Sequence, residues 1–177
     1  MNYATIKYND IANGLGVRTS LFVSGCTHRC KGCFNSEAWD FKYGKPFTEE
    51  VENAIIVSLE GDFNDGLSLL GGEPFEPKNQ KALRPFLEKV KALYPTKTIW
   101  CYTGYVLETD LLNETGRAHT DDTIKMLLLI DVLVDGPFIE EQKNISLRFK
   151  GSENQRIIDV PSSLKNNKTI LFEIEKY

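Results

Sequence analysis

The chain has 177 residues, of which 41% are hydrophobic and 26% charged, a composition that argues against disorder, collagen and coiled coil. Its net charge of -4 argues against a protein that neutralises long runs of nucleic-acid phosphate, and its length suits one domain, residues 1–177. No apolar run is long enough for a membrane span, and the first eight residues lack the blocks of a signal peptide. We therefore expect a cytoplasmic protein without nucleic-acid or membrane partners.

Short apolar segments alternate with segments of helical periodicity along the chain, which favours an α/β fold with parallel strands. The predicted strands are mostly apolar, as strands covered on both faces are, and comprise residues 20–24, 67–70, 98–102, 132–135 and 156–160, with 169–172 as a further candidate. The predicted helices are 48–59, 79–94 and 120–130, and Pro85 is expected to kink the second.

Unusual residues follow four of the predicted strands directly. The segments are Gly25-Cys26, Gly71-Gly72-Glu73-Pro74, Thr103-Gly104 and Asp135-Gly136-Pro137. Binding sites in parallel α/β folds form at the carboxyl ends of the strands, where the loops converge. The sequence therefore predicts one site built from these four strand ends.

The first of these loops carries three cysteines, Cys26, Cys30 and Cys33, with the spacing C-x3-C-x2-C. One loop of this length can bring three thiolates around a single iron-sulfur cluster, and thiolates are soft ligands suited to iron. A 4Fe-4S cluster held by three cysteines keeps one iron free to bind a substrate. Cys101 lies in a distant apolar stretch, where we expect a buried packing thiol.

The alternative from the residues alone is a structural zinc site with four Cys or His ligands. His28 or Cys101 would then join the three cysteines of the loop. Zinc ligands usually come as two separate pairs, and the sequence holds no second C-x2-C pair. His28 and His119 are expected to be exposed loop residues, so a zinc-stabilised binding module remains the weaker interpretation.

A strand, the C-x3-C-x2-C loop and then Gly71-Gly72-Glu73-Pro74 after the next strand together resemble the signature of the radical S-adenosylmethionine superfamily. The resemblance implies that Cys26, Cys30 and Cys33 ligate a 4Fe-4S cluster whose fourth iron is chelated by S-adenosylmethionine. The reduced cluster of that superfamily cleaves S-adenosylmethionine to methionine and a 5'-deoxyadenosyl radical. It also implies a shortened, open (βα) partial barrel, because eight βα units typically take about 250 residues.

The same resemblance suggests which residues contact S-adenosylmethionine. Gly71, Gly72 and Glu73 match the strip that receives the methionine ammonium, with a backbone carbonyl or the Glu73 carboxylate as acceptor. The superfamily often has an aromatic residue at the position of Gly32, beside Cys33, and Phe34 either replaces it against adenine or packs in the core. Two strand-end residues complete the expected set as contacts of S-adenosylmethionine or a bound cation, Thr103 and Asp135, although Asp before Gly is more simply an ordinary turn residue.

Within the superfamily, nearly the whole chain resembles the glycyl-radical activating enzymes that serve anaerobic ribonucleoside-triphosphate reductase. The matching stretches include Asn13-Gly14, 21–25, 33–35, 103–105, 132–136 and Gly151-Ser152. The resemblance implies two partners, the large reductase whose glycine loses a hydrogen atom and a one-electron donor such as flavodoxin or ferredoxin. The open side of a partial barrel would admit the glycine loop. An activase of another glycyl-radical enzyme, such as pyruvate formate-lyase, is the alternative.

Overall fold

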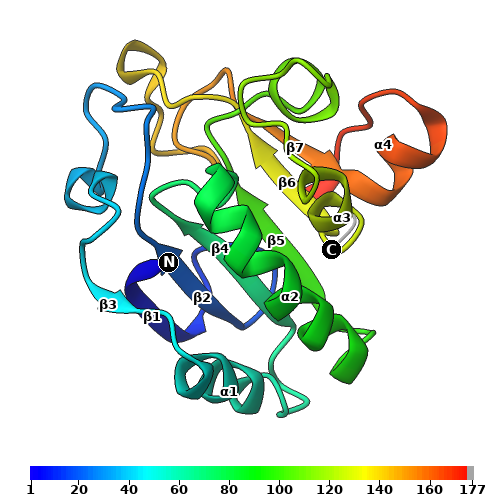
Figure 1. Ribbon diagram of the computed structural model, residues 1–177. Helices are drawn as coiled ribbons and strands as arrows, with labels where there is room; N and C mark the ends of the chain where they lie inside the picture. Colours follow the sequence, from blue (N-terminus) through cyan, green and yellow to red (C-terminus); the bar gives the residue numbers. More distant parts are fainter. Residues whose placement is uncertain (175–177) are drawn as a thin grey trace.

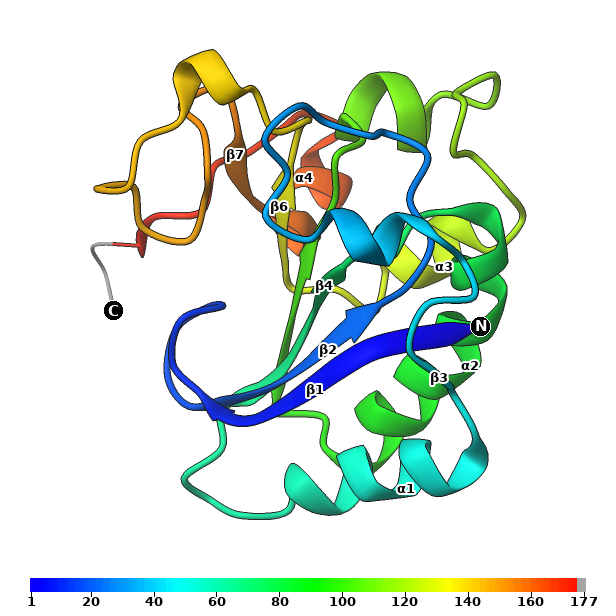
Figure 2. The same cartoon turned by 90° about the vertical axis from the view of Figure 1, so that its left-hand side faces the viewer.

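The computed structural model describes residues 1–174, which form a curved mixed sheet (Figures 1 and 2). Its strand order is β3-β1-β2-β4-β5-β6-β7. Strands β2, β4, β5 and β6 run parallel, whereas β1, β3 and β7 pair antiparallel with their neighbours. The strand bounds are β1 Asn2–Asp10, β2 Arg18–Val23, β3 Lys45–Pro46, β4 Gly66–Gly71, β5 Thr98–Tyr102, β6 Val132–Asp135 and β7 Arg156–Asp159.

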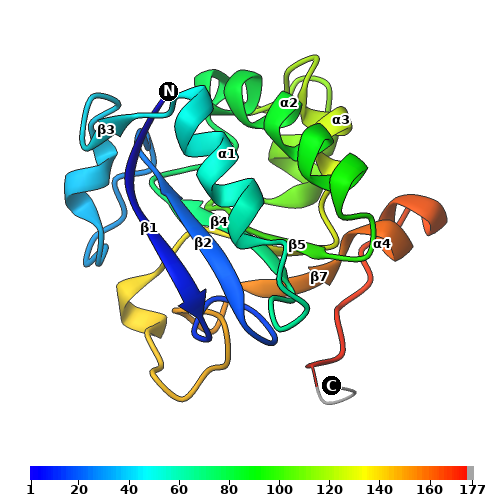
Figure 3. The same cartoon turned by 90° about the horizontal axis from the view of Figure 1, so that it is seen from below.

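Two longer helices, α1 (Glu49–Ser58) and α2 (Pro77–Leu93), cover one face of the sheet, as the view from below shows (Figure 3). The apolar spacing predicted for α2 is confirmed, because Leu83, Phe86 and Val90 are all fully buried. The shorter helical segments are α3 Thr123–Leu127, α4 Val160–Asn166, η1 Ser36–Trp39, η2 Leu107–Leu112 and η3 Glu140–Gln142. Over residues 1–174, none of the helices combines the length and apolarity of a membrane span.

The two faces of the sheet carry separate cores. Ile99 and Cys101 of β5 belong to the large core under the helices. Trp100 belongs to a smaller core on the opposite face, against which Tyr102 and Phe149 pack. Side chains of a strand alternate between faces, so each β5 residue contributes to one core only. The face opposite the helices is the one that leads to the site described below.

Most predicted elements are confirmed to within two or three residues, and the differences have physical causes. Strand β1 was not predicted, because its sequence NYATIKYND is polar and half exposed, as suits a strand near the sheet edge. The helix predicted at 120–130 forms only over Thr123–Leu127, and 169–172 contributes a single bridge, Leu171 to Ile158. Helix α2 continues through Pro85.

The direction of β7 corrects the expectation of parallel strands throughout, since β7 runs antiparallel to β6. A parallel neighbour requires a crossover that returns the chain to the opposite end of the sheet. The segment 136–155 makes no such crossover. Asn154 and Gln155 donate side-chain hydrogen bonds to the carbonyls of Pro137 and Gly136, so the chain re-enters the sheet at the end where it left.

Candidate cluster and cofactor site

The loops that follow β2, β4, β5 and β6 gather at one end of the sheet, the upper part of Figure 1. They surround a pocket of about 440 Å³. All three loop cysteines line it, together with Gly71, Gly72, Glu73, Thr103, Gly104 and Gly136. The structure therefore brings the four predicted strand ends to one site.

The cysteine loop is held at its start by the segment that follows it. The amide of Gly25 donates to the carbonyl of Ala38 (2.8 Å), and the amide of Cys26 donates to that of Trp39 (3.2 Å). Cys26, Cys30 and Cys33 are partly exposed free thiols. Burial, with a smaller effect of the nearby Glu73 charge, raises the pKa of Cys26 to about 12, so a bound cation is needed to stabilise its thiolate.

Neither candidate for a fourth zinc ligand is free to join these thiols. Cys101 is fully buried in the core on the helix side of the sheet, which confirms the expected packing role. His28 corrects the expectation of an exposed loop residue, because its side chain is only 7% exposed. Both of its ring nitrogens are engaged, with Glu73 and Arg117.

The glycine strip lies directly against the cysteine loop. The amide of Gly72 donates to the carbonyl of Val23 (2.7 Å), and the amide of Glu73 donates to that of Gly25 (2.9 Å). A Cβ atom on Gly72 would lie 2.6 Å from the carbonyl oxygen of Gly25 and 2.9 Å from that of Ala38. Gly72 is therefore required by the contact between strip and loop, a reason that the sequence did not reveal.

The Glu73 carboxylate is buried and already has four donors in the protein. They are the amides of Phe75 (2.8 Å) and Gly104 (2.7 Å), the hydroxyl of Thr103 (2.7 Å) and Nε2 of His28 (3.1 Å). An ionised carboxylate offers about four acceptor positions. Glu73 thus organises the pocket wall, with the acceptor positions of its carboxylate occupied by donors of the protein.

Asp135 and Phe34 are placed differently from the rest of the predicted set. The Asp135 carboxylate accepts hydrogen bonds from Arg156 (2.9 Å) and the Leu107 amide (2.9 Å), and the residue does not line the pocket. Side-chain alternation along β6 explains why Asp135 does not line the pocket. Val134 belongs to the core on the pocket face, so its neighbour Asp135 projects from the other face. Phe34 lines the pocket beside Gly32 and is 85% exposed, which excludes the core interpretation.

Tyr102 and Glu76 belong to the site but were not predicted. Tyr102 lines the pocket from the last position of β5. Its buried hydroxyl has no hydrogen-bond partner among residues 1–174, and burial raises its pKa. Tyr102 lies two residues after Trp100 in β5, so both side chains project from the same face of the sheet. Glu76 accepts hydrogen bonds from the amide and hydroxyl of Thr27 (2.7 and 2.6 Å), and no sequence pattern pointed to it.

Comparison with known proteins identifies an iron-sulfur cluster domain in this chain. Residues 12–158 match the family model described as a 4Fe-4S single cluster domain. The chain is 46% identical over 159 residues to the anaerobic ribonucleoside-triphosphate reductase-activating protein of Haemophilus influenzae, an alignment that covers 89% of this chain and 97% of that protein. The chain belongs to the family of anaerobic ribonucleoside-triphosphate reductase-activating proteins.

Two further relatives of the same name show how evenly the family matches. The protein of Vibrio cholerae is 44% identical, with 89% of this chain and 97% of that one covered. The protein of Escherichia coli K12 is 42% identical, with 88% and 96% covered. These alignments span nearly the full length of each relative, so the resemblance noted in the sequence is confirmed at the level of the family.

The donor set of this family member fits a cluster better than a single ion. Within residues 1–174, no three His, Cys, Asp or Glu side chains surround one metal-ion position. In a 4Fe-4S cluster each thiolate binds a different iron, so the three thiolates stand farther apart than ligands of one zinc. The three free thiols of Cys26, Cys30 and Cys33, on one loop beside a pocket, fit a cluster of this kind.

Proposed function

We propose that this protein is a radical S-adenosylmethionine oxidoreductase that activates an anaerobic ribonucleoside-triphosphate reductase. One observation carries the proposal: three unpaired cysteine thiols of one loop share a pocket with a glycine strip, and no fourth thiol faces that pocket in residues 1–174. A cluster held there keeps one iron for a substrate. The match to activating proteins along most of the chain supports the reductase as the partner.

The chemistry resides in the cofactors, and the protein positions them. When bound, a 4Fe-4S cluster supplies one electron that cleaves S-adenosylmethionine to methionine and a 5'-deoxyadenosyl radical, which takes a hydrogen atom from a reductase glycine to give 5'-deoxyadenosine and a glycyl radical. Cys26, Cys30 and Cys33 would hold the cluster. Gly71 and Gly72 line the pocket with bare backbone, whose carbonyls would accept hydrogen bonds from the methionine ammonium.

Phe34 and the segment after β6 would complete the pocket. Phe34 stands exposed on the rim next to Gly32 and Cys33, where its ring is available to stack on adenine. Phe138 and Phe149 line the pocket from the segment after β6 and would limit access of water. We further propose that the curved sheet in Figure 2 is an open partial barrel, which admits the glycine of a large protein from its uncovered side.

The test is an anaerobic activation assay. The reconstituted protein, reduced with dithionite and given S-adenosylmethionine, should generate a glycyl-radical doublet in the paramagnetic resonance spectrum of the reductase. Exposure to air should then cut the reductase chain at that glycine. Stoichiometric zinc without iron would overturn the cluster assignment. A silent reductase together with a doublet on pyruvate formate-lyase would replace the partner and keep the cluster.

A further inference from the structure

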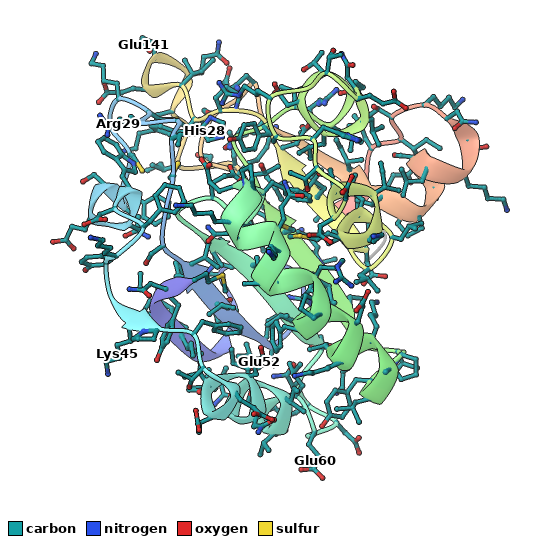
Figure 4. All side chains as sticks on the ribbon, viewed as in Figure 1. His28, Arg29, Lys45, Glu52, Glu60 and Glu141 are labelled. Carbon is teal, nitrogen blue, oxygen red and sulfur yellow. The ribbon has the colours of Figure 1, made fainter. Side chains whose placement is uncertain are left out.

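His28 lies inside the cysteine loop, between Cys26 and Cys30, yet its side chain is turned inward. Figure 4 places His28 among the strand-end loops, close to Arg29, which is exposed. Only 7% of the His28 side chain is exposed. A histidine held so completely between two cysteine ligands has a role in the site beyond that of a loop residue.

Both ring nitrogens of His28 have partners, and the partners define the tautomer. Nδ1 lies 2.7 Å from Nη2 of Arg117, and Nε2 lies 3.1 Å from Oε2 of Glu73. A guanidinium can only donate hydrogen bonds, so Nδ1 is the acceptor. The proton of a neutral imidazole then sits on Nε2, which donates to the Glu73 carboxylate.

Neighbouring residues also pack closely against the His28 imidazole ring. The ring of Tyr105 packs against it with the centroids 4.3 Å apart, and the Arg117 guanidinium lies over the same tyrosine, 4.7 Å from its centroid. Gly104 is also close, since a Cβ atom on it would lie 2.8 Å from the imidazole. Gly104 is thus the residue that makes room for His28 to reach Glu73.

Glu73 connects this histidine to the end of β5. Its carboxylate accepts at the same time from the Thr103 hydroxyl and the Gly104 amide, both at the end of β5. Thr27, which precedes His28 in the cysteine loop, is also fixed, because its amide and hydroxyl both donate to Glu76. The first half of the cysteine loop is therefore tied to the glycine strip through side chains.

We propose that His28 is a positioning residue that fixes the cluster ligands relative to the S-adenosylmethionine-binding strip. This inference rests on the proposed function. One wall of the pocket would bind the cluster and the other would bind S-adenosylmethionine, and the reaction between them depends on their separation. The Glu73–His28–Arg117 arrangement sets that separation, and His28 itself is not a ligand of iron.

Three variants of the full-length protein test the role. His28→Ala removes both hydrogen bonds, His28→Gln restores a donor and an acceptor, and Gly104→Ala keeps the imidazole but pushes it away from Glu73. His119→Ala is the matched control, because the second histidine bonds the Leu111 carbonyl and does not line the pocket. The readouts are iron per chain, S-adenosylmethionine affinity by equilibrium dialysis, and hydrogen exchange of the metal-free cysteine loop.

We expect His28→Ala and Gly104→Ala to bind S-adenosylmethionine at least tenfold more weakly, a loss of about 1.4 kcal/mol, and to exchange the cysteine-loop amides faster. His28→Gln should recover much of the affinity. Loss of iron in His28→Ala that His28→Gln restores also supports positioning. Wild-type affinity and exchange in His28→Ala would overturn the proposal, and so would loss of iron in both His28 variants, which would make the imidazole a ligand.

These readouts separate the inference from the proposed function. A wild-type protein that binds iron but not S-adenosylmethionine would contradict the proposed function. Hydrogen exchange of the metal-free loop would then still decide whether His28 fixes the loop to the strip, because this measurement requires neither cofactor.

Discussion

The two ends of the parallel strands use polar residues in opposite ways. At the amino end, Arg18 opens β2 and is completely buried, with a pKa that burial lowers to about 10. All of its guanidinium N–H groups donate to neutral oxygens, on Ser68, Thr98, Leu15 and Leu67, at 2.7 to 3.1 Å. These bonds join β2, β4 and β5 to one another.

At the carboxyl end of the same strands, thiols and a hydroxyl line the pocket. The three loop cysteines form no disulfide, and within residues 1–174 the buried Tyr102 hydroxyl has no hydrogen-bond partner. An unsatisfied polar group is costly in a closed core, so the Tyr102 hydroxyl indicates a place prepared for a ligand. Substitutions at the amino end should therefore reduce stability, and substitutions at the carboxyl end should reduce binding.

The largest effect is expected from the thiols. Cys30→Ala removes one of the three proposed ligands, which no other cysteine can replace, so the reconstituted protein should lose its cluster and its activase activity completely. Cys101→Ala is the matched control, because Cys101 lies in the core on the far side of the sheet. Iron analysis and paramagnetic resonance after anaerobic reconstitution measure both. Iron retained in Cys30→Ala would show that another residue completes the cluster site.

Arg18→Leu tests the amino end. The substitution leaves buried oxygens on Ser68, Leu67 and Thr98 without their donor, at about 1 to 3 kcal/mol for each unsatisfied group. We expect the free energy of unfolding of the metal-free protein to fall by about 3 kcal/mol or more in urea titrations. Arg84→Leu, which removes ion pairs from a partly exposed arginine, should change the free energy of unfolding far less than Arg18→Leu. Equal losses of stability in Arg18→Leu and Arg84→Leu would contradict a stabilising role of the amino end.

The sequence predicted the middle of this sheet better than its flanks. Strands β4, β5 and β6 are continuous apolar runs between turn residues, a pattern that only buried parallel strands require. The polar β1 carries no such signal, and the direction of β7 depends on where residues 136–155 travel, which no local pattern encodes. Arg18 resembles a surface arginine in sequence because its burial depends on acceptors from β4, β5 and the loop before β2.

The site was predictable to the extent that its chemistry is local. The cysteine spacing lies within one loop, and the glycine strip follows a recognisable strand, so both were found. The partners of Glu73 come from three loops far apart in the chain, and its hydrogen bonds to Thr103 and His28 could not be read from any of them. The direction of Asp135 away from the pocket follows from side-chain alternation along β6, since Val134 belongs to the core on the pocket face.

Substitutions of Gly72 test why the carboxyl end of β4 requires a glycine. If a side chain there only occupied ligand space, valine would be far worse than alanine. The structure instead places the Cβ position 2.6 Å from the Gly25 carbonyl, so Gly72→Ala should already show most of the effect of Gly72→Val. We expect both variants to bind S-adenosylmethionine over tenfold more weakly, about 1.4 kcal/mol, and to retain less iron. Wild-type binding by Gly72→Ala would show that the strip tolerates a side chain.

The smallest effect is expected from a charged residue that lies near the carboxyl ends of the strands but outside the pocket, where its carboxylate is paired with an arginine. Glu108 accepts two hydrogen bonds from Arg156 (2.9 and 2.7 Å), which lower the pKa of its carboxyl from 4.5 to about 2. Because the folded-state pKa is the lower one, the stabilisation is present above pH 4.5 and lost as the pH falls toward 2. The side chain is 42% exposed, so Glu108→Gln should cost less than about 1 kcal/mol at pH 7. Urea unfolding of the metal-free protein should show that the difference in free energy of unfolding between wild type and Glu108→Gln shrinks below pH 4.5. Cofactor binding at pH 7 should be unchanged. A difference that stays constant down to pH 3 would contradict the ion pair.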